Sequence, residues 1–89
     1  MDITTQSGFK CKIDEKKIKD WEFIKYLGMI DSEDDSDRLK GITKAVPFIL
    51  GTKGEKALMD FLRKDNNVAD AESVINIFTE IINKASSKN

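Results

Sequence analysis

The chain has 89 residues, with 15 lysine and arginine side chains against 16 aspartate and glutamate side chains, for a net charge of −1. This length is short for a domain, so it predicts one small domain over residues 1–89 and leaves no room for a separate cofactor domain. The balanced charge argues against a generally basic protein that binds nucleic acid or anionic lipid through its whole surface.

Histidine is absent, and cysteine occurs once, at Cys11. These counts exclude an intramolecular disulfide, a Cys/His zinc site and a histidine-based catalytic triad. The carboxylates fall mostly on helix faces predicted to be exposed, where general acid catalysis gains nothing, so we expect no enzyme activity, no cofactor and no metal. We interpret Cys11 as a small buried hydrophobic residue. Residues 1–8 carry no basic segment followed by an apolar run, and apolar runs elsewhere span only a few residues, so neither export nor membrane insertion is indicated.

Charge is uneven along the chain. Residues 31–37 carry five acidic side chains, whereas residues 38–64 carry seven basic and two acidic ones. The acidic run predicts an exposed connector, because its charges repel one another and it has little apolar content. A calcium loop starting at Asp31 would need Gly at its sixth position and Glu at its twelfth, which are Ser36 and Ile42 here, so the connector is preferred.

Residues 8–13 predict a strand, because apolar residues alternate with lysines from Phe9 to Ile13. The backbone groups of a single strand need a partner. We expect residues 3–5 to fold back onto this strand through a turn at residues 6–8. Pairing with the same strand of a second copy is the alternative.

A first helix is predicted over residues 15–30, with Asp14 as its N-cap. Its apolar residues surround the whole circumference of the helix, so it must be covered on several sides. One interpretation is a central helix around which the other elements pack. The other is that part of its surface, around Phe23 and Tyr26, contacts another protein chain.

A second helix is predicted over residues 36–50, with Ser36 as its cap. Pro47 interrupts its apolar pattern, and a proline inside a helix removes a backbone hydrogen bond. We therefore predict a kink near Pro47 that changes the direction of Phe48. If this helix runs straight instead, Phe48 is an exposed anchor for a partner.

Two further helices follow. Gly51 ends the second helix, and a third is predicted over residues 53–64. Asp70 caps a fourth over residues 70–85, which has the clearest apolar stripe in the chain, and residues 86–89 are expected to fray. The elements together predict a mainly α (α+β) fold, a four-helix small domain with a short N-terminal β-hairpin or strand.

The turn at Gly51 also allows a helix-turn-helix interpretation, in which the third helix reads DNA. That helix carries four basic residues, namely Lys53, Lys56, Arg63 and Lys64. Glu55 and Asp60 interrupt its basic face, and the acidic run would repel a phosphate backbone. A small DNA-binding or regulatory protein is therefore the alternative interpretation, and nucleic acid is not the partner we expect.

Seven short motifs follow one another along the chain: Ser7-Gly8-Phe9, Ile13-Asp14, Trp21-Glu22-Phe23, Leu50-Gly51, Leu62-Arg63, Asp65-Asn66-Asn67-Val68 and Glu80-Ile81. Taken in this order, they resemble the tail assembly chaperones of long-tailed bacteriophages, or prophages, of Gram-positive bacteria. The resemblance covers about residues 7–83, and Asn66-Asn67 stands where family members often have Asp-Gly.

The resemblance implies a non-catalytic protein in the cytoplasm of the infected or lysogenic host. Such a protein binds the tape measure protein, helps recruit tail tube subunits and is absent from the mature virion. We hypothesise that Phe23, Tyr26 and Phe48 contribute to the partner surface, because they are the large side chains least well explained by one inner face. Self-association, through strand pairing or the first helix, stays open.

Overall fold

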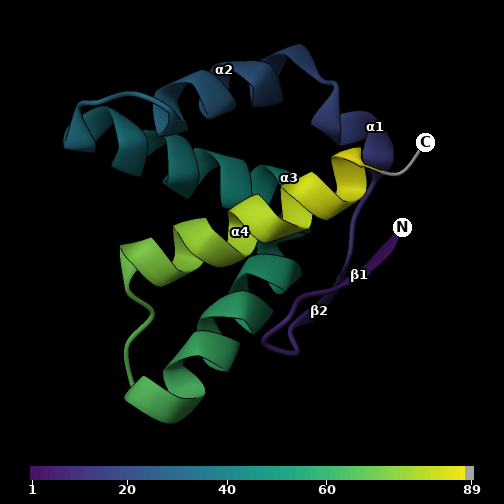
Figure 1. The fold of residues 1–89 in the computed structure, drawn as a ribbon, viewed down its shortest axis with the longest axis vertical. Helices are drawn as coiled ribbons and strands as arrows, with labels where there is room; N and C mark the ends of the chain where they lie inside the picture. Colours follow the sequence, from purple (N-terminus) through teal and green to yellow (C-terminus); the bar gives the residue numbers. More distant parts are fainter. Residues whose placement is uncertain (88–89) are drawn as a thin grey trace.

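In the computed structural model, which describes residues 1–87 apart from the side chain of Asn66, the chain forms two short strands and four helices (Figure 1). The predicted fold class, a mainly α domain with an N-terminal β-hairpin, is confirmed. Of the tail predicted to fray, Ser86 belongs to the last helix and Ser87 caps it, and residues 88–89 lie outside the described residues.

The strands β1 (Asp2–Thr4) and β2 (Lys10–Lys12) form an antiparallel hairpin in which Ile3 lies opposite Cys11. This confirms the predicted fold-back of residues 3–5. Apolar side chains of the hairpin face the core, where Ile3, Phe9 and Ile13 are buried. The period of two in the sequence thus identifies the buried face correctly.

The prediction of one helix over residues 15–30 was wrong, because the chain forms α1 (Glu15–Ile18) and α2 (Trp21–Ile30). Asp14 caps α1 as predicted. Asp20 has extended backbone geometry, and its carboxylate accepts a hydrogen bond from the Glu22 amide at 2.8 Å. A second N-cap therefore starts a new helix within the apolar pattern.

Helix α3 (Asp35–Asn66) contains both the second and the third predicted helix. Its cap is Asp34 and not Ser36, since the Asp34 carboxylate accepts the Ser36 amide hydrogen bond at 3.1 Å. The predicted kink near Pro47 was also wrong, because the only residue with non-helical backbone angles inside α3 is Gly51, at φ 76° and ψ 170°. Glycine reaches this region without the steric cost that a side chain imposes, so the chain bends there.

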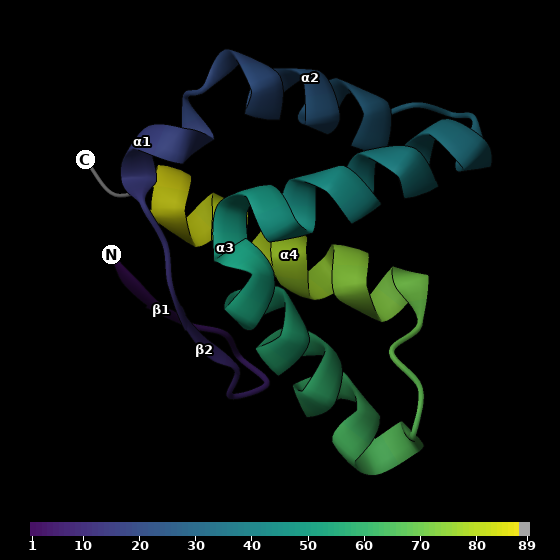
Figure 2. The same cartoon turned by 180° about the vertical axis from the view of Figure 1, so that it is seen from behind.

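Helix α4 (Ala71–Ser86) begins after Asp70, whose carboxylate accepts the Ser73 amide hydrogen bond, as predicted. It packs against both α3 and the hairpin (Figure 2). Two hydrogen bonds join it to the start of the chain: Lys84 Nζ donates to the Thr4 carbonyl oxygen, and the Gln6 amide donates to Glu80, both at 2.7 Å. The hairpin is therefore held by the last helix.

Helix α3 passes close to α2 at Gly41. A methyl group at position 41 would lie 2.8 Å from the Met29 Cβ atom and 2.9 Å from both the Ile30 amide nitrogen and the Tyr26 carbonyl oxygen. Two of these neighbours are backbone atoms, which cannot rotate away as a side chain can. Only glycine lets α2 and α3 lie this close together.

We predict that Gly41→Ala destabilises the protein by about 1–3 kcal/mol, because the added methyl group overpacks the contact between the two helices. Gly28→Ala is the matched control, since a methyl group there meets no atom within 4 Å and alanine favours helix more than glycine does. Urea unfolding of both variants measures the difference. Equal effects of the two substitutions would contradict a close contact at Gly41.

Candidate functional site

The structure brings the three predicted partner-binding residues together in one aromatic cluster between α2 and α3. The Phe23 and Phe48 rings stack with centroids 6.3 Å apart and planes 5° from parallel. Tyr26 meets Phe48 edge to face at a centroid distance of 5.9 Å. The sequence interpretation therefore grouped residues that are neighbours in space.

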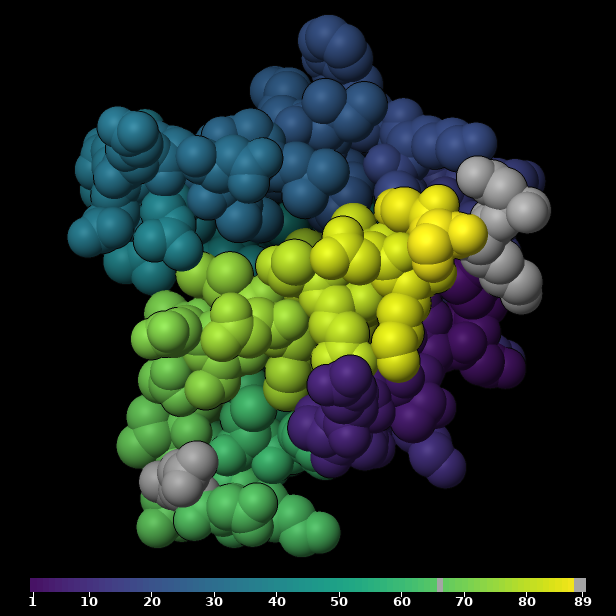
Figure 3. All heavy atoms as spheres, in the orientation of Figure 1, coloured from purple at the N-terminus to yellow at the C-terminus, as the bar shows by residue number. Residues whose placement is uncertain are grey.

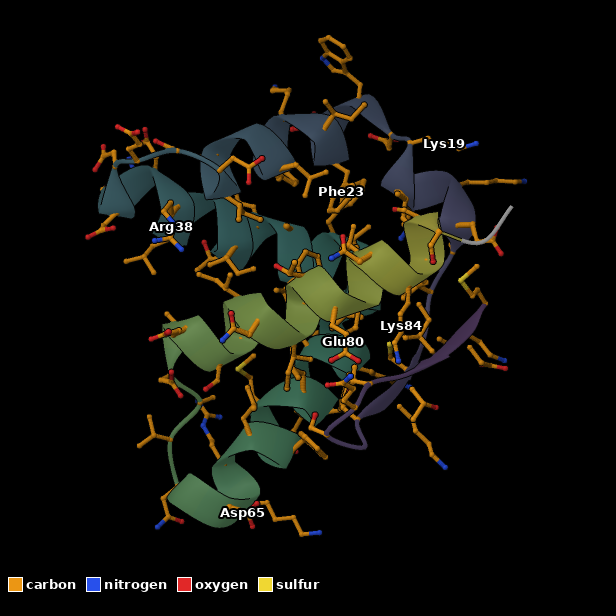
Figure 4. The ribbon with its side chains drawn as sticks, in the orientation of Figure 1. Lys19, Phe23, Arg38, Asp65, Glu80 and Lys84 are labelled. Atoms are coloured by element: carbon orange, nitrogen blue, oxygen red, sulfur yellow. The ribbon has the colours of Figure 1, made fainter. Side chains whose placement is uncertain are left out.

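Phe23 has no exposed surface, so its prediction as a residue of a docking surface was wrong. Its ring also meets Phe78 of α4 edge to face, at a centroid distance of 6.2 Å. In Figure 4 the labelled Phe23 side chain points from α2 into the body of the domain. Tyr26 and Phe48 are partly exposed, and their part in partner binding stays a prediction.

Polar contacts hold the exposed edge of this cluster. Lys17 Nζ lies 5.6 Å from the centroid of the Phe48 ring and 3.4 Å from the Phe48 carbonyl oxygen. The Tyr26 hydroxyl donates a hydrogen bond to Glu22 at 3.2 Å, and partial burial together with the Glu22 charge raises the Tyr26 pKa. The aromatic rings of the cluster are thus packed within the molecule and its polar groups have hydrogen-bond partners there, so it is not an open aromatic patch.

The strongly exposed apolar side chains of α2 are Trp21, which is 74% exposed, and Ile24, which is 49% exposed. Sequence reasoning did not select either residue. The signal was available, because a rotation of 100° per residue places Trp21 nearly opposite Phe23 on the helix. Once Phe23 is assigned to the core, Trp21 must face outward.

A groove lies between α3 and the start of α4, and it consists of two adjoining cavities that share Leu39 and Ala71. The first has a volume of about 460 Å³ and lies between the N-terminal ends of the two helices. The second has a volume of about 220 Å³ and reaches toward the far half of α3. We call this the α3–α4 groove; its apolar lining consists of Leu39, Ile42, Val46, Met59, Ala69, Ala71, Val74 and Ile75.

The groove is open to a partner from outside. The first turns of α3 and α4 border it in Figure 3, where the atoms of residues 35–40 and 70–76 form neighbouring parts of the same surface. Leu39 is 45% exposed at its rim. The sequence analysis did not foresee the groove, because its walls come from distant parts of the chain.

Charged groups at the rim of the groove are mostly acidic. Asp35, Glu55 and Glu72 line it, against one basic side chain, Arg38. The Arg38 guanidinium lies 3.8 Å from the Asp35 carboxylate, and in Figure 4 its side chain extends from α3 toward α4. The apolar floor and acidic rim together suit an apolar ligand surface that carries basic groups at its edge.

The remaining candidates for a chemical or membrane role are the Cys11 thiol, the acidic side chains and the helices. Burial raises the pKa of the half-buried Cys11 thiol, which lowers the fraction of reactive thiolate. Within residues 1–87, no three His, Cys, Asp or Glu side chains gather closely enough to hold a metal ion. Over the same range, none of the helices combines the length and the apolar character needed to cross a membrane.

The basic residues of the helix-turn-helix interpretation lie on the second half of α3, beyond the bend at Gly51. All four are exposed. Lys56 forms an ion pair with Asp60 at 2.8 Å, so one of the basic groups is partly neutralised by its own helix.

Phe23→Ala should remove about 3–5 kcal/mol of stability, because it leaves a cavity where α2, α3 and α4 meet. That loss approaches the whole stability of a small domain. Phe23→Leu, which keeps most of the volume, should lose clearly less. Urea unfolding measures the stability of both variants. Substitutions outside the core change the free energy of unfolding by about 0.5 kcal/mol. A loss of stability below about 1 kcal/mol for Phe23→Ala would therefore favour a surface role for this residue.

Comparisons of the chain with protein family models, with curated proteins and with solved structures find no match. The geometry and charge of the groove, and the exposed apolar residues of α2, are therefore the features that bear on function.

Proposed function

We propose that the protein is a bacteriophage tail assembly chaperone, a non-catalytic protein that binds a helical segment of the tape measure protein and helps recruit tail tube subunits. It acts in the cytoplasm of the infected or lysogenic bacterial host and leaves before the virion is complete. The observation that carries the proposal is the α3–α4 groove, an open apolar surface between helices.

The shape of the groove supports a helical ligand. An amphipathic helix presents apolar side chains at positions i, i+3, i+4 and i+7, and it binds by placing this stripe in an apolar groove between helices. The two adjoining cavities offer successive places for such side chains, with Leu39 between them. Such a lining binds an apolar surface, and this binding requires no titratable side chain with a shifted pKa.

The charge of the groove narrows the ligand further. Its rim carries Asp35, Glu55 and Glu72, and Asp35 belongs to the acidic run of residues 31–37. A helix with lysine or arginine beside its apolar stripe would find opposite charges along both edges. The proposed segment of the tape measure protein is therefore amphipathic and basic at its flanks.

A contact between this groove and one helix would be small, and this size favours reversible binding. A groove built from parts of two helices buries less surface than a permanent interface, and small interfaces are typical of transient complexes. A chaperone must release its client when the tube subunits replace it. The groove thus suits temporary covering of apolar helix surface that would otherwise aggregate.

The first test is the genomic neighbourhood, where we expect a tail tube gene upstream and a very long tape measure gene downstream. The second is co-purification with that tape measure protein. Leu39→Asp should lower its capture about tenfold or more, because a charge replaces an apolar side chain that lines both cavities of the groove. Ile24→Asp is the matched control, since Ile24 is similarly exposed but lies on α2, outside the groove.

Both variants should fold, because each substitutes a side chain that is about half exposed. Circular dichroism and thermal unfolding check this. Capture that survives Leu39→Asp would reject the groove as the binding site. A genomic setting without tail genes would reject the function itself.

A further inference from the structure

The outer face of α2 carries an apolar stripe that none of the described residues 1–87 covers. Trp21, Ile24 and Gly28 lie on this face, at spacings of three and four residues. All three are exposed, and a methyl group added at Gly28 would meet no atom within 4 Å. Figure 1 shows α2 along one edge of the molecule, with α1 at one end and the loop to α3 at the other, so the whole stripe is accessible.

We infer that this face binds a second copy of the chain, with the two α2 helices antiparallel about a two-fold axis between Ile24 and Lys25. In this arrangement Trp21 of each copy packs on Gly28 of the other. The inference concerns a different surface from the α3–α4 groove and does not rest on the proposed function.

The positions of the large and the small residue on this face support a two-fold pairing. Trp21 and Gly28 lie equally far from the midpoint between Ile24 and Lys25, one toward each end of the helix. An isologous interface requires that each surface match itself after rotation, so every protruding group needs a hollow at the related position. Gly28 provides such a hollow, because the bare backbone lets the indole ring lie directly against the helix.

The centre of the interface also matches itself. Ile24 of one copy faces Lys25 of the other, whose aliphatic stem can cover it while the ammonium group stays in water. Lys25 forms only a long ion pair with Glu22, at 3.8 Å, so its side chain is free to move. The largest exposed side chain, Trp21, is then covered on both copies.

Charge selects the antiparallel over the parallel arrangement. The acidic run, residues 31–37, covers the loop after α2 and the first residues of α3, and it carries five acidic side chains. Parallel pairing would place the two loops together, whereas antiparallel pairing puts them at opposite ends of the dimer. It also brings each loop toward the exposed lysines before α2 in the other copy, Lys16 and Lys19.

Four acidic residues, Asp14, Glu15, Asp20 and Glu22, lie among the three lysines at positions 16, 17 and 19, so this end of the molecule is not basic overall. Asp14 and Asp20 turn their carboxylates to the amides of Lys16 and Glu22, at 3.0 and 2.8 Å, where they cap α1 and α2. The Lys19 side chain extends away from the body of the molecule (Figure 4). Antiparallel pairing thus brings the extended Lys19 side chain of one copy toward the acidic run of the other.

The contact is small, since α2 has ten residues and only one face takes part. Interfaces below about 1,200 Å² are typical of weak, transient complexes. We therefore expect a dimer that depends on concentration and weakens as salt screens the charges. Sedimentation equilibrium between about 10 μM and 1 mM covers the range in which such a complex forms.

The single tryptophan provides a second measurement, because its emission should shift to shorter wavelength as the dimer forms and covers the ring. Trp21→Gln should lower the association constant about tenfold or more. Gly28→Leu distinguishes a specific pairing from non-specific apolar association. In the specific pairing it should weaken the dimer, because the leucine side chain fills the hollow that receives Trp21. Stronger association of Gly28→Leu would overturn the proposed pairing.

A charge exchange tests the antiparallel arrangement. Lys19→Glu and Glu33→Lys should each lower the association constant about threefold, and the double variant should restore it. A protein that stays monomeric up to about 1 mM, with unchanged tryptophan emission, would overturn the inference. So would a dimer that survives both Trp21→Gln and Gly28→Leu.

Discussion

The contact at Gly41 determines how the two sides of α2 are used. Because α3 presents bare backbone at this point, α2 lies close enough for its Phe23 side to reach both α3 and α4. Its other side is then turned fully outward, with Trp21 at its start. A helix that is apolar all round is therefore divided into a core face and an exposed face by the absence of one side chain on its neighbour.

The bend at Gly51 has an equally direct effect on the groove. Leu39, Ile42 and Val46 come from the half of α3 before the bend, and Met59 comes from the half after it. A straight helix could not place these residues around one cavity. The same bend sends the second half of α3 toward the hairpin, so a single backbone conformation shapes both the groove and the contact that supports β2 (Figure 2).

Local signals in the sequence predicted most of the fold. The alternation from Phe9 to Ile13, the caps at Asp14 and Asp70 and the apolar stripe of α4 each depend on residues a few positions apart. The break at Asp20 was missed because the apolar pattern continues across it, and cap residues also occur inside helices.

The site was harder to predict than the fold. The sequence located the break at Gly51, which appears as the bend inside α3, but it could not show that the helix continues through Pro47. Nor could it place Phe23 inside and Trp21 outside, because that choice depends on which face α3 approaches. The groove forms where three chain segments come together: the two halves of α3 and the start of α4. No local sequence pattern predicts such a long-range arrangement.

The hydrogen bonds from α4 to the hairpin join residues about eighty positions apart in the chain. Non-local pairings of this kind are slow to form, because a long loop must close before they are gained. During synthesis on the ribosome the hairpin emerges first and α4 last, so the first strands to be made must wait for the final helix before they are secured. A nascent or prematurely terminated chain that lacks α4 would lose the contacts of that helix with Phe23 and with β1, which gives the cell's proteases a means of telling it from the finished protein.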